Sequence, residues 1–226
     1  LDFEEFLWAL GDNVTARVLK SFFDRKAAVG EVLHRKVMNQ FRQYLLVGGM
    51  PQPILEYVSS KNFAKVDRIK KNILDLYRQD ITRFAKGYES NVLAVFDEIP
   101  SQLSKKEKKF SITSLGKNSK TRTYIDSFMW LTEGMIINNC YNATDPTVGL
   151  SMYLDNASQK CYMSDTGLLV THSFKDNDYS SNELYKSVLL DKIEINEGML
   201  MKNIVAQMLR ANGHNLYFYS RYDNIN

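Results

Sequence analysis

The sequence predicts an α+β protein that is predominantly helical. Up to about residue 134, apolar residues recur at spacings of three and four, which is the period of helices that bury one face. Short apolar stretches with β-branched residues, typical of strands, are found after that point. An apolar content of 44% and a charged content of 24% over 226 residues are ordinary for globular proteins and suffice for one large domain or two small ones.

The first half of the chain is expected to form five helices. Asp2 and Glu5 have the spacing of a capping box, which predicts the start of the first helix, and Gly11 predicts its end. The glycine pair at residues 48–49 predicts a clean end to the third helix. The five expected helices are residues 3–10, 14–24, 31–47, a short helix after Pro53, and residues 62–86.

A second region begins after these helices and changes from helix to strand. Residues 92–99 are expected to form a helix that ends around Pro100-Ser101. A lysine-rich run and a helix at residues 120–133 follow, and Gly134 supplies the stop. Strand candidates come next, at residues 135–141, 152–154 and 160–163. Helices followed by a β-hairpin have the element order of a winged helix.

The tail is expected to begin an α/β layer. Residues 174–181 are polar and turn-rich, residues 194–212 carry a helical stripe, and residues 216–219 form a strand. A lone terminal strand leaves its hydrogen-bonding edges unpaired, so we expect the chain to be a piece of a longer protein. The expected domains are residues 1–58, 59–173 and 174–226.

Several kinds of site are not expected in this chain. No apolar run approaches the ~20 residues that span a bilayer, no signal peptide opens the chain, and two cysteines fit reduced thiols, so a cytoplasmic protein without a membrane partner is expected. The string from Ser114 to Thr121 has serine at both positions where a phosphate loop requires glycine. The three histidines are far apart, and no nucleophile elbow occurs. No catalytic, cofactor-binding or metal-binding residue is assigned, and enzyme activity stays open.

The strongest local signal is a basic segment. Residues 105–122 contain seven basic residues and one acid, Glu107, so this segment has a net charge of +6 and the rest of the chain sums to −3. Such a patch steers polyanions, and cationic side chains at a helix N-terminus suit phosphate contact. The candidate DNA-binding residues are Lys105, Lys106, Lys108, Lys109, Lys117, Lys120 and Arg122.

The helix after this segment allows two interpretations. As the second helix of a helix-turn-helix, it would enter the major groove of double-stranded DNA. Alternatively, Trp130 docks on a neighbouring domain. In both cases the helix face opposite Trp130 packs into the core. At 3.6 residues per turn, that face holds Ile125, Phe128, Met129 and Leu131. Asp126 in mid-helix would repel phosphate, so DNA contact and docking both stay open.

Seven strings in a fixed order resemble one protein family. They are LDFEEFLWALG (1–11), FRQYLLVGGMPQPILEY (41–57), DLYRQDITRFAK (75–86), IPSQLSKKEKKF (99–110), WLTEGMI (130–136), CYMSDTGLL (161–169) and NEGMLMKNIVAQML (196–209). Together they resemble the C-terminal two-thirds of a large bacterial and archaeal family of predicted AAA-type ATPases. In that family an N-terminal P-loop ATPase domain precedes a C-terminal domain of unknown function.

The resemblance implies an identity for each expected domain. Residues 1–58 would end the helical lid of the ATPase module, residues 59–173 would be a helical linker and a winged-helix-like domain, and residues 174–226 would begin a restriction-endonuclease-like segment. The P-loop, and with it ATP and Mg²⁺, would belong to a missing N-terminal domain, which would be a partner of this chain. Such tails carry a glutamate where this sequence has Lys202, and a lysine removes a Mg²⁺ ligand.

The expected function follows from the resemblance together with the basic segment. We expect a non-nucleotide-binding C-terminal fragment of a predicted AAA-type ATPase that acts as a regulatory or DNA-docking region. The alternatives are a protein–protein interaction module and a degenerate nuclease-like domain. The salt dependence of binding distinguishes DNA docking from protein–protein interaction. Phosphate contacts make affinity fall steeply as salt concentration rises, and an apolar interface does not.

Overall fold

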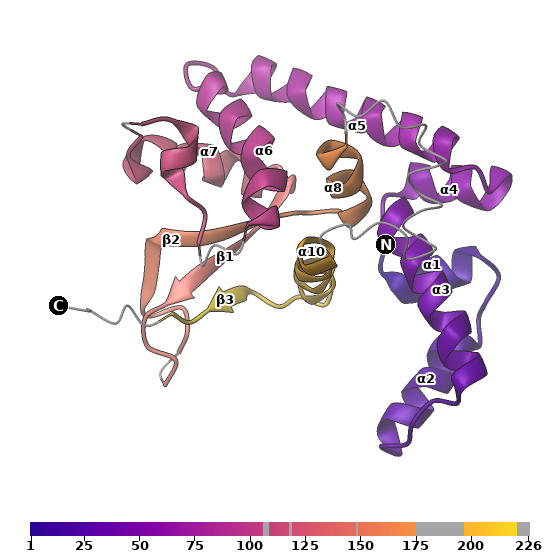
Figure 1. The fold of residues 1–226 in the computed structure, drawn as a ribbon. Coiled ribbons are helices and arrows are strands. Elements are labelled where there is room, and N and C mark those ends of the chain that lie inside the picture. Colours follow the sequence, from indigo (N-terminus) through magenta and orange to yellow (C-terminus); the bar gives the residue numbers. More distant parts are fainter. Residues whose placement is uncertain (106–108, 118, 148, 175–196, 221–226) are drawn as a thin grey trace. The chain divides into compact units, whose positions relative to one another are not determined.

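The computed structural model describes residues 1–105, 109–117, 119–147, 149–174 and 197–220 (Figure 1). It confirms the predicted class, because the protein is α+β and predominantly helical. The chain divides into two compact units. Unit 1 comprises residues 1–74 and 165–200, and unit 2 comprises residues 75–164 and 201–226. These boundaries differ from those of the three expected domains, whose identities stay predictions.

Unit 1 is built from helices, most of them where the apolar periodicity predicts. Asp2 and Glu5 form the predicted capping box: the Glu5 amide donates to Asp2 Oδ1 at 2.9 Å and the Asp2 amide donates to Glu5 Oε2 at 2.8 Å. The helices are α1 (Phe3–Ala9), α2 (Thr15–Asp24), α3 (Glu31–Val47), α4 (Pro51–Ser60), the first half of α5 (Phe63–Phe84) and α8 (Thr166–Ser173). Helix α4 begins earlier than predicted because a proline in the first turn has no N–H to leave unpaired.

The core of unit 1 forms where α1 meets α3 and α4, and α3 also contacts α8. Phe6, Tyr44 and Tyr57 are buried there, and the Phe6 ring centroid lies 5.3 Å from that of Tyr44 and 6.2 Å from that of Tyr57. Aromatic rings at such separations add to the free energy gained by burying their area. Helix α2, although amphipathic, leaves apolar side chains such as Phe23 exposed.

Two turns of unit 1 interlock at the level of the backbone. Asp165 is the N-cap of α8 and its carboxylate accepts from the Leu168 amide at 2.9 Å. The same carboxylate accepts from the Gly49 amide, in the turn between α3 and α4, at 2.6 Å. A Cβ added to Gly167 would lie 2.5 Å from the carbonyl oxygen of Val47. The two turns therefore approach each other more closely than any side chain would permit.

A buried lysine joins the same turns. Lys70 of α5 is fully buried, and its Nζ donates to the carbonyl oxygens of Leu46 at 2.7 Å and Gly167 at 3.2 Å. Because burial disfavours the charged form, the pKa of Lys70 falls to about 8. One turn earlier on α5, the buried Asp67 accepts from the Thr171 hydroxyl of α8 at 2.8 Å. Polar contacts thus tie α3, α5 and α8 together inside unit 1.

Unit 2 has helices on both faces of a small sheet. Its elements include α6 (Glu89–Ser104), the 3₁₀ helix η1 (Ile112–Leu115), α7 (Thr121–Glu133), β1 (Ile137–Ala143), β2 (Leu154–Met163), most of α10 (Glu197–Ala211) and β3 (Leu216–Phe218). The described strands have the order β2-β1-β3, with β1 antiparallel to β2 and parallel to β3. Figure 1 shows α6 and α7 on one face of this sheet and α10 on the other.

The pairing register places alternate residues on these two faces. Cys140 of β1 lies opposite Lys160 of β2 and Leu216 of β3, so the three side chains share a face. Ala206 of α10 is buried against Cys140 and Leu216, which identifies this as the α10 face. The other face packs against α6 and α7. Helix α10 is also tied to β2 through the buried Asn203, whose Nδ2 donates to the Met163 carbonyl at 3.1 Å.

Three details of unit 2 correct the sequence prediction. The predicted helix end at Pro100 is wrong, because α6 continues through it to Ser104 while Gln102 and Leu103 become buried and offset the lost hydrogen bond. The strand predicted at 160–163 is the end of a longer strand, β2, which begins at Leu154, so only the last residue of the strand predicted at 152–154 is in a strand. Strand β3 pairs with β1, so the tail adds to the sheet of the hairpin. The winged-helix identity of this region stays a prediction.

The predicted core face of α7 is half wrong. Phe128 and Leu131 are buried as expected, but Ile125 is 38% exposed and Met129 is 51% exposed. Tyr124 lies in the core in their place. The apolar residues of this helix spread over more than its buried stripe, so periodicity alone did not fix the orientation of the helix.

No helix in the part of the chain that the structure describes has both the length and the apolar character to cross a membrane.

Candidate functional site

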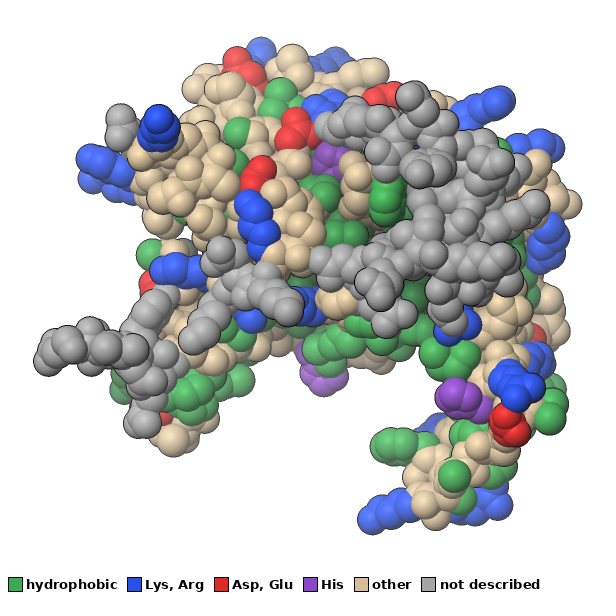
Figure 2. All heavy atoms as spheres, viewed as in Figure 1, with side chains coloured by type: hydrophobic (Ala, Val, Ile, Leu, Met, Phe, Trp, Pro, Cys, Tyr) green, Lys and Arg blue, Asp and Glu red, His purple; other side chains and the backbone are tan. Residues whose placement is uncertain are grey.

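The described residues of the basic segment lie in unit 2 with their side chains in solvent. Lys105 follows the last turn of α6, Lys117 lies in the turn before α7, Lys120 is the N-cap of α7 and Arg122 lies in its first turn. Lys109 lies just before η1. Lys106 and Lys108 lie outside the described residues. Figure 2 shows Lys and Arg side chains over the part of unit 2 that contains α7 and the end of α6, at the left of the view.

Buried neighbours hold Phe110 and Ser111, just before η1, in place. Gln102, buried in the last turn of α6, accepts from the Ser111 amide at 2.8 Å and donates to Ser114 Oγ at 2.9 Å. Phe110 packs edge-on against Phe128 of α7, with ring centroids 5.1 Å apart. The Phe110 amide also donates to a carbonyl oxygen of β2 at 2.7 Å. Lys105, at the end of α6, and Lys109, next to Phe110, therefore both adjoin residues that are held by the core.

One lysine of the segment already has an acidic neighbour. Lys105 Nζ lies 3.4 Å from Glu98 Oε1 of α6. Burial opposes ionisation of Glu98, but hydrogen bonds from Gln102 and other neighbours outweigh it and lower the pKa of this carboxyl. Glu98 is therefore ionised at neutral pH and offsets part of the Lys105 charge.

Lysines from three separate elements line one small pocket of unit 2. Lys105 and Lys109 come from the basic segment, Lys160 from β2 and Lys202 from α10. The remaining lining residues are Gln102, Leu103, Phe110, Cys161 and Tyr162, so no carboxylate lines this pocket in the described part of the chain. We call Lys105, Lys109, Lys160 and Lys202 the lysine rim.

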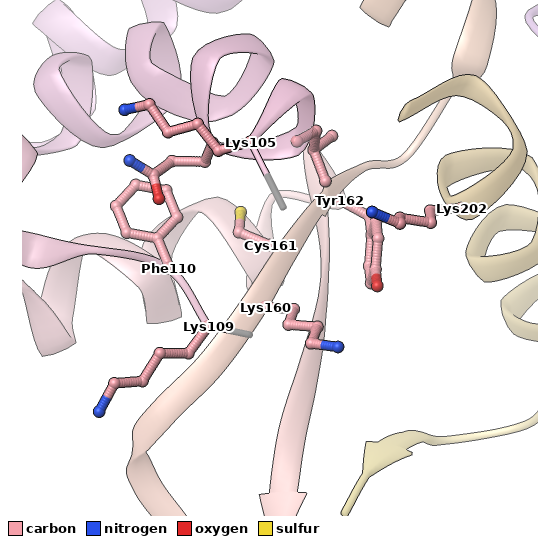
Figure 3. Close-up of a pocket in the computed structure, with 9 residues that line it drawn as sticks. Lys105, Lys109, Phe110, Lys160, Cys161, Tyr162 and Lys202 are labelled. Carbon is pink, nitrogen blue, oxygen red and sulfur yellow. The ribbon is translucent and has the colours of Figure 1, made fainter. Parts of the chain in front are cut away.

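The lysine rim does not converge on one point. Figure 3 shows Lys105 and Lys109 extending outward on one side of the strand that carries Cys161, while Lys202 reaches from α10 toward the Tyr162 ring. A single small ion would need its donors to meet at one place. Separated ammonium groups instead suit a chain of anions, such as the phosphates of a nucleic acid backbone.

Two members of the rim were not predicted as contacts. Neither Lys160 nor Lys202 belongs to the basic segment, and the sequence marks Lys202 only as a lysine in place of a metal ligand. The period of two along β2 places Lys160 and Tyr162 on one face, and this signal was available in the sequence. The meeting of β2 with α10 depends on a tertiary contact that local pattern does not reveal.

Helix α7 is a weaker candidate for entering a DNA groove than the sequence suggests. Its exposed residues include Arg122 but also Asp126 and Glu133, whose carboxylates would face the phosphates. The cations Lys117, Lys120 and Arg122 cluster only at its start. Trp130, the predicted docking residue, is half-buried. Helix α7 is therefore basic only at its start, and its later turns carry exposed carboxylates.

An apolar groove lies beside the lysine rim on the α10 face. It has a volume of about 420 Å³ and shares Tyr162 and Lys202 with the lysine pocket. Its other lining residues are Cys140, Leu150, Val205, Ala206, Leu209, His214, Asn215, Leu216, Tyr217 and Phe218. The ammonium of Lys160 lies 4.5 Å from the centroid of the Phe218 ring, a cation–π contact that places a rim lysine at this groove.

Burial raises the pKa of the titratable thiols and of a tyrosine hydroxyl in this sheet. Cys140 and Cys161 are free and buried, and burial raises the pKa of both thiols, that of Cys140 to about 11. Burial likewise raises the pKa of Tyr162 to about 12, so its hydroxyl stays protonated at neutral pH. Among the described residues, no group of three or more His, Cys, Asp or Glu side chains could hold a metal ion.

The fold and site together define an α+β chain with a lysine rim beside an apolar groove. Residues 38–179 match the family model described as a domain of unknown function, DUF8612, and since this is more than half of the chain, the protein belongs to that family. The matched region runs from α3 to the residues just after α8 and includes the whole basic segment. No curated protein and no solved structure matches the chain.

Proposed function

We propose that this chain is the C-terminal, non-nucleotide-binding part of an AAA-type ATPase, and that the lysine rim of unit 2 docks nucleic acid. The observation that best supports the docking role is the gathering of four lysines from three elements around a pocket that no described carboxylate lines. ATP and Mg²⁺ would belong to an N-terminal domain that is a partner of this chain. The chain itself would act as a regulatory or docking region.

The chemistry of the rim favours docking over cleavage. A nuclease needs carboxylates that hold Mg²⁺, and a positive charge at Lys202 repels a divalent cation. The same positive charge attracts phosphate. Dispersed lysines release condensed counterions when they meet a nucleic acid backbone, which supplies affinity without sequence recognition.

The proposal is tested by fluorescence anisotropy of the chain with a labelled 20-base-pair duplex and a labelled 20-nucleotide single strand, titrated between about 50 and 200 mM salt. The rim variant is Lys109→Ala/Lys160→Ala/Lys202→Ala. The matched control, Arg17→Ala/Lys20→Ala/Arg35→Ala, removes the same charge from the exposed surface of α2 and α3 in unit 1.

We expect salt-sensitive binding that the control variant keeps and the rim variant loses. Each phosphate contact removed should reduce the slope of log affinity against log salt by about 0.9 for the duplex or about 0.7 for the single strand. Absence of binding to either nucleic acid at low salt would contradict the proposal. Equal losses in the rim and control variants would also contradict it, because the effect would then follow net charge rather than the site.

A second candidate is supported by the exposed apolar side of α7. Ile125 and Met129 are one turn apart and both exposed, beside the half-buried Trp130. An apolar side chain pair of this kind, with an aromatic neighbour, suits a protein interface. In this alternative, unit 2 docks a protein through α7. Binding would then resist salt and would be lost in Ile125→Ser/Met129→Ser rather than in the rim variant.

A further inference from the structure

We infer that the site formed by the lysine rim and the adjoining groove takes single-stranded DNA rather than duplex. The inference rests on the proposed nucleic-acid function and specifies the form of the ligand. Its basis is that Tyr162 and Lys202 line both the lysine pocket and the apolar groove. Groups suited to phosphates therefore border directly on groups suited to bases.

The groove has the composition of a base-stacking surface. The aromatic residues Tyr162 and Phe218, which the register places on the α10 face, line it together with Tyr217 and aliphatic residues of α10. Its volume of about 420 Å³ lies in the range of cavities that enclose a small organic molecule. In a duplex, the bases are stacked on one another and cannot enter such a groove. In a single strand they are free to stack on aromatic rings, as they do in proteins that bind single strands.

The charges around the groove match a strand that carries one anion per base. Lys202 lies at the boundary with the lysine pocket, and Lys160 reaches the groove by its contact with Phe218. His214 is exposed at the groove and offers ring nitrogens for hydrogen bonds. The described residues that line the groove include no Asp or Glu. A neutral apolar peptide would leave these cations unused, and this charge complementarity favours a polyanion with apolar bases.

DNA is favoured over RNA by the apolar lining. Most of the residues that line the groove are apolar or aromatic. A 2′-hydroxyl held against such a surface would lose its water without gaining a hydrogen bond, and that loss costs free energy. Deoxyribose has no hydroxyl at this position and avoids this cost. The proposed occupant is therefore single-stranded DNA with its phosphates on the lysine rim and its bases in the groove.

The inference is tested with three labelled ligands at equal salt: a 20-nucleotide poly-dT strand, a 20-nucleotide poly-U strand and a 20-base-pair duplex. Two substitutions separate stacking from folding. Tyr162→Phe keeps the ring, while Tyr162→Leu keeps much of the volume without it. Because Tyr162 packs on the buried cluster of Cys140, Ala206 and Leu216, thermal unfolding of both variants is measured in parallel. Lys202→Glu, at an exposed side chain, is a third variant that does not disturb this packing.

We expect poly-dT to bind at least tenfold more tightly than the duplex. Tyr162→Leu should weaken poly-dT about tenfold and leave the duplex unchanged, Tyr162→Phe should retain poly-dT affinity, and Lys202→Glu should weaken poly-dT whatever the stability of the Tyr162 variants. Duplex binding as tight as poly-dT binding, with loss in the rim variant, would overturn the single-strand inference and leave the proposed function standing. Tighter binding of poly-U would overturn the choice of DNA, and no binding of any ligand would overturn both proposals.

Discussion

Units 1 and 2 use their charged side chains in opposite ways. In unit 1, Asp165 and Lys70 are buried and bind backbone amides and carbonyls of neighbouring turns. In unit 2, the lysine rim stays at the surface beside an apolar groove. A buried charge is tolerated only with good partners, whereas an exposed charge is available to a ligand. The charged side chains of unit 1 therefore stabilise its fold, whereas those of unit 2 form a candidate binding site.

The two units also differ in how closely other atoms approach their glycines. In unit 1, an added Cβ at Gly167 or Gly48 would collide with neighbouring atoms at 2.5 Å or less, and Gly48 also has a positive φ of 85°. In unit 2, an added Cβ at Gly134 would lie 3.3 Å from the Trp130 carbonyl oxygen, and one at Gly116 would lie 2.9 Å from the hydroxyl of the flexible Ser119 side chain. Among the described glycines, the closest approach to neighbouring backbone is therefore that of Gly167 in the interlocked turns of unit 1. The sequence strings that meet there, VGG and SDTG, are explained by packing without invoking a ligand.

The largest expected effect is that of Gly167→Ala. The new methyl group would lie 2.5 Å from the Val47 carbonyl oxygen and 2.6 Å from the Gly48 nitrogen, both backbone atoms that cannot move without shifting α3 or α8. We expect a loss of about 4 kcal/mol or more in the free energy of unfolding, or no folded protein. Urea denaturation followed by circular dichroism measures it.

Gly30→Ala is the matched control for this substitution. Gly30 also lies in unit 1, has no atom within 4 Å of the added Cβ, and does not have a positive φ. As the N-cap of α3 it should change stability by less than about 1 kcal/mol. A similar loss in both variants would show that the interlock of the two turns is not the cause.

The next effect in size is that of Asp165→Asn. The carboxylate accepts from the amides of Gly49 and Leu168 with different oxygens. Replacing one oxygen by NH₂ would place a side-chain N–H against a backbone N–H. We therefore expect the free energy of unfolding to fall by about 2 kcal/mol. Asp145→Asn is the control, because the exposed Asp145 accepts from the Thr147 amide at 2.8 Å and should cost less than about 1 kcal/mol. Equal costs in the two variants would argue against a special role for the buried carboxylate.

Much of the fold could be predicted from local pattern. Helix α3 has its predicted limits, and the capping box of α1 is confirmed, because periodicity and capping act over a few residues. The failures lie where tertiary contact decides. Pro100 is kept inside α6 by the burial of the residues that follow it, and Ile125 is exposed because α7 turns Tyr124 toward the core.

The candidate site was only partly predictable for the same reason. Lys105 and Lys109 stand out in the sequence because they belong to a dense basic run. Lys160 and Lys202 are isolated lysines in separate elements, and they join the rim only because β2 and α10 meet at the sheet. The buried role of Lys70 was likewise hidden, since a lysine on a long amphipathic helix is typically solvated. A dense run of basic residues is visible in the sequence, whereas a cluster of lysines from separate elements forms only when the chain folds.

The smallest of these effects is a pH dependence that comes from Lys70. Its pKa in the folded state is about 8, compared with 10.5 ordinarily, because it is fully buried. Between these values the unfolded chain binds more protons than the folded one, so the free energy of unfolding rises with pH. The neutral amine has two N–H groups and can still donate to both the Leu46 and Gly167 carbonyls. Relative to Lys70→Met, the wild-type chain should gain about 1.5 kcal/mol between pH 8 and pH 9.5.

Urea denaturation of the wild-type chain and of Lys70→Met across this pH range measures the difference directly, since other titrating groups are common to both chains. Lys202→Met is the control from unit 2, because it removes a lysine whose side chain is exposed rather than buried. Parallel pH profiles for the wild-type chain and Lys70→Met would mean that water reaches the ammonium group in solution, and the contrast between a buried charge in unit 1 and exposed charges in unit 2 would then fail at its central residue.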